Sequence, residues 1–291
     1  MGVKMTTIPG MPTAVNKNPL QKFFRQPAIY FTPPSGGRWW PAGAMNVPPT
    51  GEFAVFPMTS RDEVLLRTPD ALLNGQGMVD VIQSCIPDIK DAWKMPATDV
   101  DAVLIAMRIA SYGHQMDFES KCPHCEEEHT YALDLRTMLD QIKAPNFEET
   151  FTYEDITVKF RPQQYYGLNR NNKINFEVQK LSQSIDNITD EDAKVNETVM
   201  QMNRLVDLNL EILAECTESI SFGDETVTDR RYILEFYKNI NSKMVSIVQT
   251  AYGELAAKGA IPKQKTNCAG CQQEMEMAIT FDYANFFASG S

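Results

Sequence analysis

The sequence is poor in the residues and motifs from which catalytic sites are usually built. It contains three histidines, of which His124 lies inside a Cys-x-x-Cys turn and His129 just beyond that turn. His114 is therefore the remaining candidate for a general base at neutral pH, and it stands alone beside Gly113. The phosphate-binding loop, the Gly-x-Ser-x-Gly elbow, the Gly-x-Gly-x-x-Gly turn and the His-Glu-x-x-His zinc motif are all missing. We therefore expect a protein that is not an enzyme.

Positive charge and long hydrophobic runs are also scarce. Lysine and arginine number 27 against 38 aspartate and glutamate residues, so the formal net charge is -11. Nucleic-acid binding relies on clustered cations that displace counterions from phosphates, which argues against such a partner. No apolar run reaches the roughly 18 residues that a membrane-spanning helix needs. The sequence thus predicts neither nucleic acid nor a membrane as a partner.

Two Cys-x-x-Cys turns contain four of the six cysteines, Cys122 with Cys125 and Cys268 with Cys271. The segments beside both turns alternate between apolar and polar residues, which is typical of strands with one buried face. The alternating apolar residues are Met116, Phe118, Tyr131, Leu133, Leu135, Met275, Met277, Ile279 and Phe281. Four thiolates at this spacing predict a tetrahedral Zn²⁺ site. Because four protein ligands leave no open position, we expect the zinc to be structural.

Three alternatives to this zinc site remain open. His124 or His129 can replace a cysteine as a ligand. Cys-Pro-His-Cys is also typical of strongly oxidising thiol oxidoreductases, although the acidic residues 126–128 that follow would raise the pKa of a thiolate. Four reduced thiols without a metal are the third alternative. Cys85 and Cys216 lie in apolar helical segments, and the whole pattern fits a reducing cytosol.

Residues 1–60 are rich in proline and glycine and predict an extended/β N-terminal arm. Its paired aromatic residues, Phe23 with Phe24 and Trp39 with Trp40, are candidates for contact with another subunit. The alternative is that they fold back on the chain's own core. If the arm binds a partner, deletion of residues 1–26 should weaken partner capture.

The rest of the first half predicts helices. A helical region spans 61–113, with Ser60 and Glu63 as a capping box at its start. A short helix is expected from Pro69 to Gly75. A longer helix that ends at Gly113 is expected to be capped by Thr98 and Asp101, with Asp99 also serving as a cap and dipole partner at its start. Its apolar residues recur at helical spacing and predict one buried stripe through Val100, Val103, Leu104, Met107 and Ala110.

The second half predicts a β-hairpin at 146–165, with its turn at Glu154 and Asp155, and a helical insertion at 166–260. Residues 221–225 are expected to form a loop. One helix of the insertion is expected to face the core with a stripe through Val195, Val199, Met202, Leu205, Leu208, Ile212 and Leu213.

A zinc-ribbon-like module is expected from residues 114–135 together with 262–291. Phe286 and Phe287 in its final segment can dock on a partner or cap the module's own core. We therefore expect an α+β fold in which a split four-cysteine zinc ribbon holds two helical regions together. A long helical insertion and an N-terminal arm complete it.

A set of unrelated motifs follows in a recognisable order in the first half of the chain. They are Ser35-Gly-Gly-Arg38, Phe56-Pro-Met-Thr-Ser-Arg-Asp-Glu63, Arg67-Thr-Pro-Asp-Ala-Leu-Leu-Asn-Gly75, Arg108-Ile-Ala-Ser-Tyr-Gly113 and Cys122-Pro-His-Cys125. In this order they resemble the T4-type baseplate hub subunit family of contractile-tailed bacteriophages. The resemblance extends to about residue 135, and the second cysteine pair lies beyond it.

This resemblance implies a subunit or assembly factor of the tail baseplate hub that acts by protein–protein binding. The implied partners are other hub proteins and the tape-measure protein, within a multi-subunit complex. The implied location is the host cytoplasm during assembly, and then the virion tail baseplate. The family supplies no catalytic residues. The alternatives are an assembly chaperone absent from the mature virion and a Cys-Pro-His-Cys thiol oxidoreductase.

Overall fold

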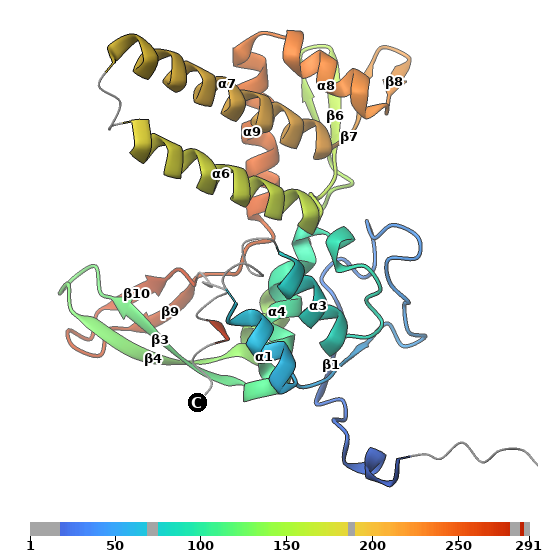
Figure 1. Ribbon diagram of the computed structural model, residues 1–291, viewed down its shortest axis with the longest axis vertical. Helices are drawn as coiled ribbons and strands as arrows, with labels where there is room; N and C mark the ends of the chain where they lie inside the picture. Colours follow the sequence, from blue (N-terminus) through green and yellow to red (C-terminus); the bar gives the residue numbers. More distant parts are fainter. Residues whose placement is uncertain (1–17, 69–74, 186–189, 280–285, 288–291) are drawn as a thin grey trace, which may run out of the picture.

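The computed structural model describes residues 18–68, 75–185, 190–279 and 286–287, and these form two lobes joined by a narrow waist (Figure 1). Three sequence-based expectations fall wholly or mostly outside these residues: the first part of the arm, the helix from Pro69 to Gly75, and Phe281 in the last strand. The chain is a mixture of helices and sheets, so the α+β class is confirmed.

The first lobe contains both ends of the described chain. Its elements are η1 (Pro19–Phe23), β1 (Ile29–Phe31), β2 (Phe53–Val55), α1 (Ser60–Leu66), α3 (Gln76–Cys85), η2 (Ala92–Lys94), α4 (Ala97–Tyr112), β3 (Gln115–Lys121), β4 (Glu128–Asp134), α5 (Leu135–Gln141), β9 (Gln264–Asn267) and β10 (Glu274–Met277). The hairpins β3–β4 and β9–β10 lie side by side at one edge of this lobe (Figure 1).

Helix α4 is the centre of the first lobe. Residues 102–107 are at most 1% exposed, so the helix is buried on all sides and not along one stripe as its pattern predicts. This burial follows from its neighbours, because α3, α5, β1 and β2 all contact it. Phe31 and Phe53, which are paired across β1 and β2, are buried in the same core. Much of the expected arm is therefore part of this lobe.

The second lobe is built on one antiparallel sheet in the order β5-β6-β7-β8. Its elements are β5 (Thr150–Tyr153), β6 (Ile156–Phe160), α6 (Tyr165–Ile185), α7 (Glu191–Glu215), β7 (Thr217–Phe222), β8 (Glu225–Val227), α8 (Arg230–Asn239) and α9 (Ser242–Ala257). β5 and β6 pair across Glu154 and Asp155, as their alternation predicts. The loop expected at 221–225 is wrong, because Ser221 and Phe222 belong to β7 and Glu225 begins β8.

Helices α6 and α7 lie side by side and extend from the body of the second lobe (Figure 1). Near the sheet, Leu208 and Leu213 of α7 are buried, as expected. Farther out, the expectation fails: Val195, Val199 and Met202 are 58%, 50% and 62% exposed. The core of this lobe draws only on the C-terminal part of α7, so the apolar stripe continues past the surface that can bury it.

Two helices begin one or two residues away from their expected caps. Thr59, and not Ser60, caps α1, and Asp62 closes the capping box by accepting from the Thr59 backbone N–H at 2.8 Å. Pro96 precedes α4, and the Ala97 N–H donates to the Gln163 carbonyl at 2.7 Å. The start of α4 thus lies at a long-range contact that the local sequence does not reveal, whereas the capping box of α1 is a local motif shifted by one residue from the expected one.

Adjacent tryptophans connect the two hydrophobic cores. Trp40 donates its indole N–H to the Asp99 carboxylate in the first lobe at 2.8 Å. Trp39 packs edge-on against Phe147 of the second core, with ring centroids 5.3 Å apart. These two rings fold back on the chain itself, which is the alternative to partner binding that the sequence leaves open.

Candidate metal centre

The four cysteines of the two Cys-x-x-Cys turns meet between the paired hairpins of the first lobe. Cys122 and Cys125 lie in the turn from β3 to β4, and Cys268 and Cys271 lie in the turn from β9 to β10. Cys122 and Cys268 are fully buried, while the second cysteine of each pair is half-buried. The long stretch of chain between the pairs includes the whole second lobe, so the cluster joins two distant parts of the sequence.

The two turns have the same backbone construction. In each, the first cysteine N–H donates to the carbonyl five residues on, from Cys122 to Glu127 and from Cys268 to Gln273, both at 2.9 Å. The backbone N–H of the residue after the second cysteine donates to the carbonyl of the first cysteine. That residue has a positive φ, which is 60° at Glu126 and 64° at Gln272. This left-handed residue curls the turn and directs both sulfurs to one side.

The sulfur positions fit a tetrahedral metal ion. The Sγ atoms of Cys122 and Cys271 are 3.8 Å apart, those of Cys125 and Cys268 are 3.6 Å apart, and all four lie within 4.8 Å of one another. A Zn–S bond of about 2.3 Å places sulfurs at the corners of a tetrahedron about 3.8 Å apart. A disulfide would need about 2.05 Å, so these are free thiols. The cluster can therefore bind a metal ion.

The electrostatics of the cluster favour a bound cation. Backbone N–H groups, first that of Cys271 and also that of Gly270, outweigh burial and lower the pKa of Cys268 to about 6. At Cys125 the Glu127 N–H favours the thiolate, but burial and the neighbouring sulfurs raise the pKa to about 12. The Cys268 thiolate thus forms readily, and it repels the negative charge of any further thiolate in the cluster. A divalent cation removes that repulsion.

The alternative histidine ligands have other contacts. A ring nitrogen of His124, Nε2, lies 3.3 Å from the Glu274 carbonyl, on the other hairpin. His129 lies 3.5 Å from the Glu127 carboxylate. A side chain at Gly270 would come within 2.8 Å of both His129 and Glu127, so the glycine lets the second turn approach the first hairpin closely. His129, Glu127 and Cys125 form a second potential ligand group, which shares Cys125 with the four-cysteine cluster.

The thiol oxidoreductase alternative loses its structural basis. In such enzymes the first cysteine begins a helix, whose N-terminus lowers the pKa of the thiol. Here Cys122 lies between two strands, β3 and β4, and its sulfur is fully buried. The Cys122 sulfur is also surrounded by three other sulfurs, which is the arrangement of a closed metal site.

The hydrophobic surfaces of the hairpins support the cluster. The Tyr131 hydroxyl lies 3.7 Å from the Met275 sulfur and accepts from the Ala269 N–H at 3.4 Å, which ties β4 to the second turn. Met275 and Met277 are 4% and 2% exposed, as the alternation in this segment predicts. The hairpins are therefore packed together by side chains as well as by their cysteines.

The candidate partner-binding aromatics divide into exposed and buried pairs. Phe23, at the end of η1, and Phe24, which follows it, are 74% and 54% exposed, and η1 projects from the body of the first lobe (Figure 1). Phe286 and Phe287 are 2% and 4% exposed and pack edge-on in the first core, with ring centroids 5.0 Å apart. These last two cap the chain's own core, so they are not presented to a partner.

Three charged residues of the first lobe were missed as organising elements. Arg25 donates to the carbonyls of Pro57 and Ser84. Asp99, expected as a helix cap, is fully buried instead and accepts three hydrogen bonds. Arg108 donates to the Phe286 carbonyl and so ties Phe286 to α4. No local pattern marks these residues, because their partners are distant in the sequence.

The fold and the cysteine cluster together define an α+β protein with a four-cysteine candidate metal centre. The sequence profile of the family described as T4 bacteriophage base plate protein matches residues 49–288, which is most of the chain. The chain belongs to this family. It is therefore a structural protein of a phage baseplate, a class that is generally non-enzymatic and works within a multi-subunit tail complex.

The other comparisons add no relative. No curated protein and no solved structure matched the chain. Among the described residues, no helix has the length and apolar character that a membrane crossing requires.

Proposed function

We propose that this protein is a subunit of the baseplate hub that binds other hub proteins through its N-terminal arm. The observation that carries the proposal is that residues 18–25 combine exposed apolar side chains with a firmly anchored last residue. Leu20, Phe23 and Phe24 are each more than half exposed. Arg25, immediately after them, is fixed to the first lobe. Exposed aromatic side chains on an anchored segment are typical of protein-binding surfaces.

The anchor at Arg25 is specific. Its guanidinium donates to the Pro57 carbonyl at 2.8 Å, to the Ser84 carbonyl at 2.7 Å and to Ser84 Oγ at 2.9 Å. It also lies 3.5 Å from the Asp62 carboxylate, which is almost fully buried. Because these contacts fix the base of the arm, the preceding aromatic residues project from a defined place on the lobe. A partner would meet them there with little ordering cost at the base.

The projecting part of α7 offers a second apolar surface. Val195, Val199, Met202 and Val206 recur at alternating steps of four and three residues, and each is at least half exposed. This is the spacing with which one helix packs along another. It supports a binding role for the second lobe and suits a helical segment of another hub protein.

We propose that the metal is zinc and that its role is structural. Zn²⁺ would supply four metal–sulfur bonds that join the two hairpins, and the four protein ligands would leave no position for a substrate. The residues that would hold it are Cys122, Cys125, Cys268 and Cys271, whose separations fit the Zn–S geometry.

A truncated chain that begins at Arg25 is expected to lose partner capture and keep its fold. The exposed aromatic residues are removed, while every contact of Arg25 remains. The sequence-based deletion of residues 1–26 would also remove this anchor, so the cut belongs before it. Tagged chains are expressed in infected cells, and the hub complexes are quantified by size separation and mass spectrometry.

The control for this truncation is Phe23→Ser with Phe24→Ser in the full chain. It keeps the length of the arm and should reduce the recovery of hub proteins about tenfold, as expected for the loss of two aromatic anchors. Unchanged recovery in both variants, with unchanged thermal unfolding, would remove the arm from the proposal.

Mass spectrometry of purified virions tests whether the protein is a hub subunit or an assembly factor. A subunit is expected in the virion at a fixed ratio to the other baseplate proteins. Detection in unfinished hub complexes together with absence from virions would contradict the subunit proposal, and an assembly factor would take its place. The tape-measure protein is the partner to seek first in cross-linked complexes, alongside the other hub proteins.

A further inference from the structure

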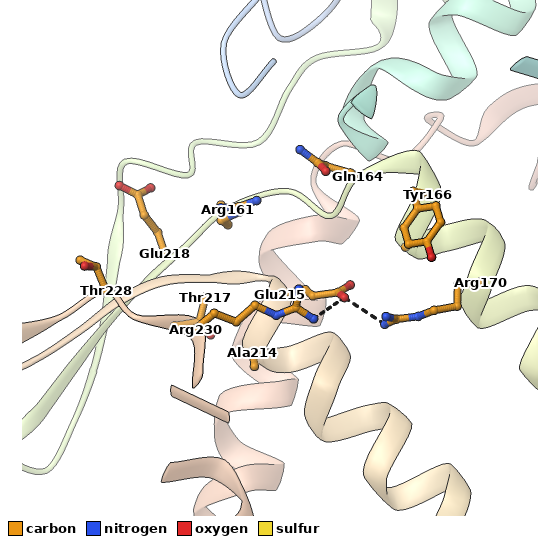
Figure 2. A pocket seen from close by; sticks show the side chains of 11 residues that line it. Arg161, Gln164, Tyr166, Arg170, Ala214, Glu215, Thr217, Glu218, Thr228 and Arg230 are labelled. Atoms are coloured by element: carbon orange, nitrogen blue, oxygen red, sulfur yellow. Dashed lines mark hydrogen bonds and ion pairs between the residues drawn. The ribbon is translucent and has the colours of Figure 1, made fainter. Parts of the chain in front are cut away.

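A pocket in the second lobe gathers three arginines in a protein whose formal net charge is -11. Arg161 follows β6, Arg170 lies in the second turn of α6, and Arg230 begins α8. The ends of α7 and β7 contribute Glu215 and Glu218. These residues surround a cavity of about 220 Å³ (Figure 2). Cations from three separate elements are thus brought to one place.

Glu215 is the internal anion of this pocket. Its carboxylate lies 3.0 Å from Arg170 and 2.5 Å from Arg230, and Figure 2 shows it between the two guanidinium groups. Its side chain is only 16% exposed, so the pair of contacts is largely shielded from solvent. A carboxylate held between two guanidinium groups shows which chemistry the pocket accommodates.

The donors of the pocket exceed the acceptors that the protein supplies. Each guanidinium has five N–H donors. Among the described residues Arg161 has no ion-pair partner, and the Nε of Arg170 is buried without a hydrogen-bond partner. Glu218 is engaged by Lys159 at 3.2 Å and does not neutralise the arginines. Unused donors therefore remain beside the carboxylate of Glu215.

The N-terminus of α6 adds to the positive potential, whereas the N-terminus of α8 is capped by the Asp229 carboxylate. The 21-residue helix α6 and the 10-residue helix α8 both begin at the pocket, and Gln164, Tyr166 and Gly167 of the α6 start line it. A side chain at Gly167 would come within 2.8 Å of Gln163 Nε2 and 3.0 Å of Glu215, so glycine permits this close approach. Helix N-termini and arginines both favour a bound anion.

We propose that this pocket binds a carboxylate on an acidic segment of a protein partner. The cavity is smaller than the roughly 300 to 1,000 Å³ of a small-molecule site and suits a single side-chain carboxylate or a chain terminus. Arg161 and the outward face of Arg230 would receive it, on the side away from Glu215. Glu215, Glu218 and the overall acidity disfavour a polyanionic nucleic acid.

The inference rests on the proposed function only for the class of the partner, a protein of the hub. Arm truncation and pocket substitution act on different lobes, so their failures are distinguishable. If the arm fails its test and the pocket binds acidic peptide, the carboxylate site stands alone. If the arm passes its test and the pocket binds no acidic peptide, binding through the arm stands and the carboxylate site is rejected.

The test is binding of a fluorescent hexaglutamate peptide to the full chain by anisotropy, at about 0.1 M salt, where long-range repulsion by the acidic protein is screened. A hexaglutamine peptide controls for the backbone and the dye. We expect saturable binding of hexaglutamate alone. Equal binding of the two peptides, or none by hexaglutamate, would overturn the proposal, as would tighter binding of a DNA oligonucleotide of the same charge.

Arginine variants localise the binding. Arg161→Gln and Arg230→Gln should each weaken hexaglutamate binding about tenfold, the scale expected when one charge-assisted contact is lost. The matched control is Arg231→Gln, which removes the same charge from the next residue of α8. Arg231 is 83% exposed and pairs with Asp229, and it does not line the pocket. An equal loss in Arg231→Gln would show general charge attraction and overturn the pocket site.

Discussion

A Cys268→Ser chain is expected to lose its bound metal and a large part of the stability of the first lobe. Cys268 is fully buried, and its sulfur lies 3.6 Å from that of Cys125. Serine leaves three thiols and a hydroxyl, which is a poor ligand for a soft site. Structural zinc contributes roughly 10 to 16 kcal/mol in small peptides. That figure is an upper limit here, because the lobe also has a hydrophobic core of its own.

Metal content and denaturant unfolding measure this effect. The wild-type chain should carry one zinc ion in its four-cysteine cluster, and a chelator should lower its free energy of unfolding. Cys268→Ser should contain no stoichiometric zinc and should be insensitive to the chelator. Wild-type protein purified without metal and unaffected by added zinc would contradict the metal centre.

The matched control is Cys85→Ala. Cys85 is also fully buried in the first core, and burial, as the main cause, raises the pKa of its thiol to about 12. Its removal should cost about 1 to 2 kcal/mol, an ordinary core effect, with zinc content unchanged. A similar loss of zinc in both variants would show that general destabilisation, and not the missing ligand, releases the metal.

The cysteine cluster was predictable because its geometry is mostly local. A Cys-x-x-Cys turn between alternating strands contains the information that directs two sulfurs to one side. Two such turns satisfy all four thiols most simply by meeting at one shared site. The meeting of Cys122 and Cys125 with Cys268 and Cys271 therefore followed from the sequence, although the packing of Tyr131 against the second turn did not.

The sequence-based predictions fail where the main contact of a residue lies far away in the sequence. The stripe of α7 has helical periodicity along its whole length, but periodicity does not say how much of it a neighbour covers, and Met202 is 62% exposed. Ser221 and Phe222 beside Gly223 read as a loop, yet β6 supplies hydrogen-bonding partners that extend them as a strand. An aspartate near a helix start is typical of a cap, whereas the partners of Asp99 are residues 35 and 40.

Removal of the Asp99 carboxylate is expected to have the second largest effect, because its side chain joins the Trp39–Trp40 segment to α4. Asp99 accepts from the Ser35 N–H at 2.8 Å, from the Ser35 hydroxyl at 2.5 Å and from the Trp40 indole at 2.8 Å. Asp99→Ala leaves the buried Ser35 N–H and the part-buried Trp40 indole N–H unpaired, at about 1 to 3 kcal/mol each, so a loss of roughly 3 to 5 kcal/mol is expected. Denaturant unfolding measures it.

Graded variants separate this effect from general core damage. Ser35→Ala removes one hydrogen bond and should cost about 1 kcal/mol. Asp99→Asn keeps the size of the side chain and one acceptor oxygen. Its loss of stability should therefore lie between that of Ser35→Ala and that of Asp99→Ala. Because Trp39 contacts Phe147 of the second core, Asp99→Ala should also change tryptophan fluorescence before global unfolding. Equal stability of Asp99→Ala and wild type would show that the carboxylate does not organise this segment.

The charge of Asp99 adds a pH dependence with a definite sign. Burial raises the pKa of this carboxyl above its ordinary value, although hydrogen bonds from Ser35 and Trp40 oppose the rise. A native pKa above the unfolded one gives a stabilising contribution below the unfolded pKa, which is lost as the pH rises through the native pKa.

Asp99→Asn has no such titratable group. The free energy of unfolding of wild type minus that of Asp99→Asn should therefore fall as the pH rises from about 3.9, the ordinary value for aspartate. Because both variants keep the same cysteines, proton release linked to the metal centre cancels in this difference. A difference that instead rises with pH would mean that the three donors outweigh burial and hold the carboxylate ionised.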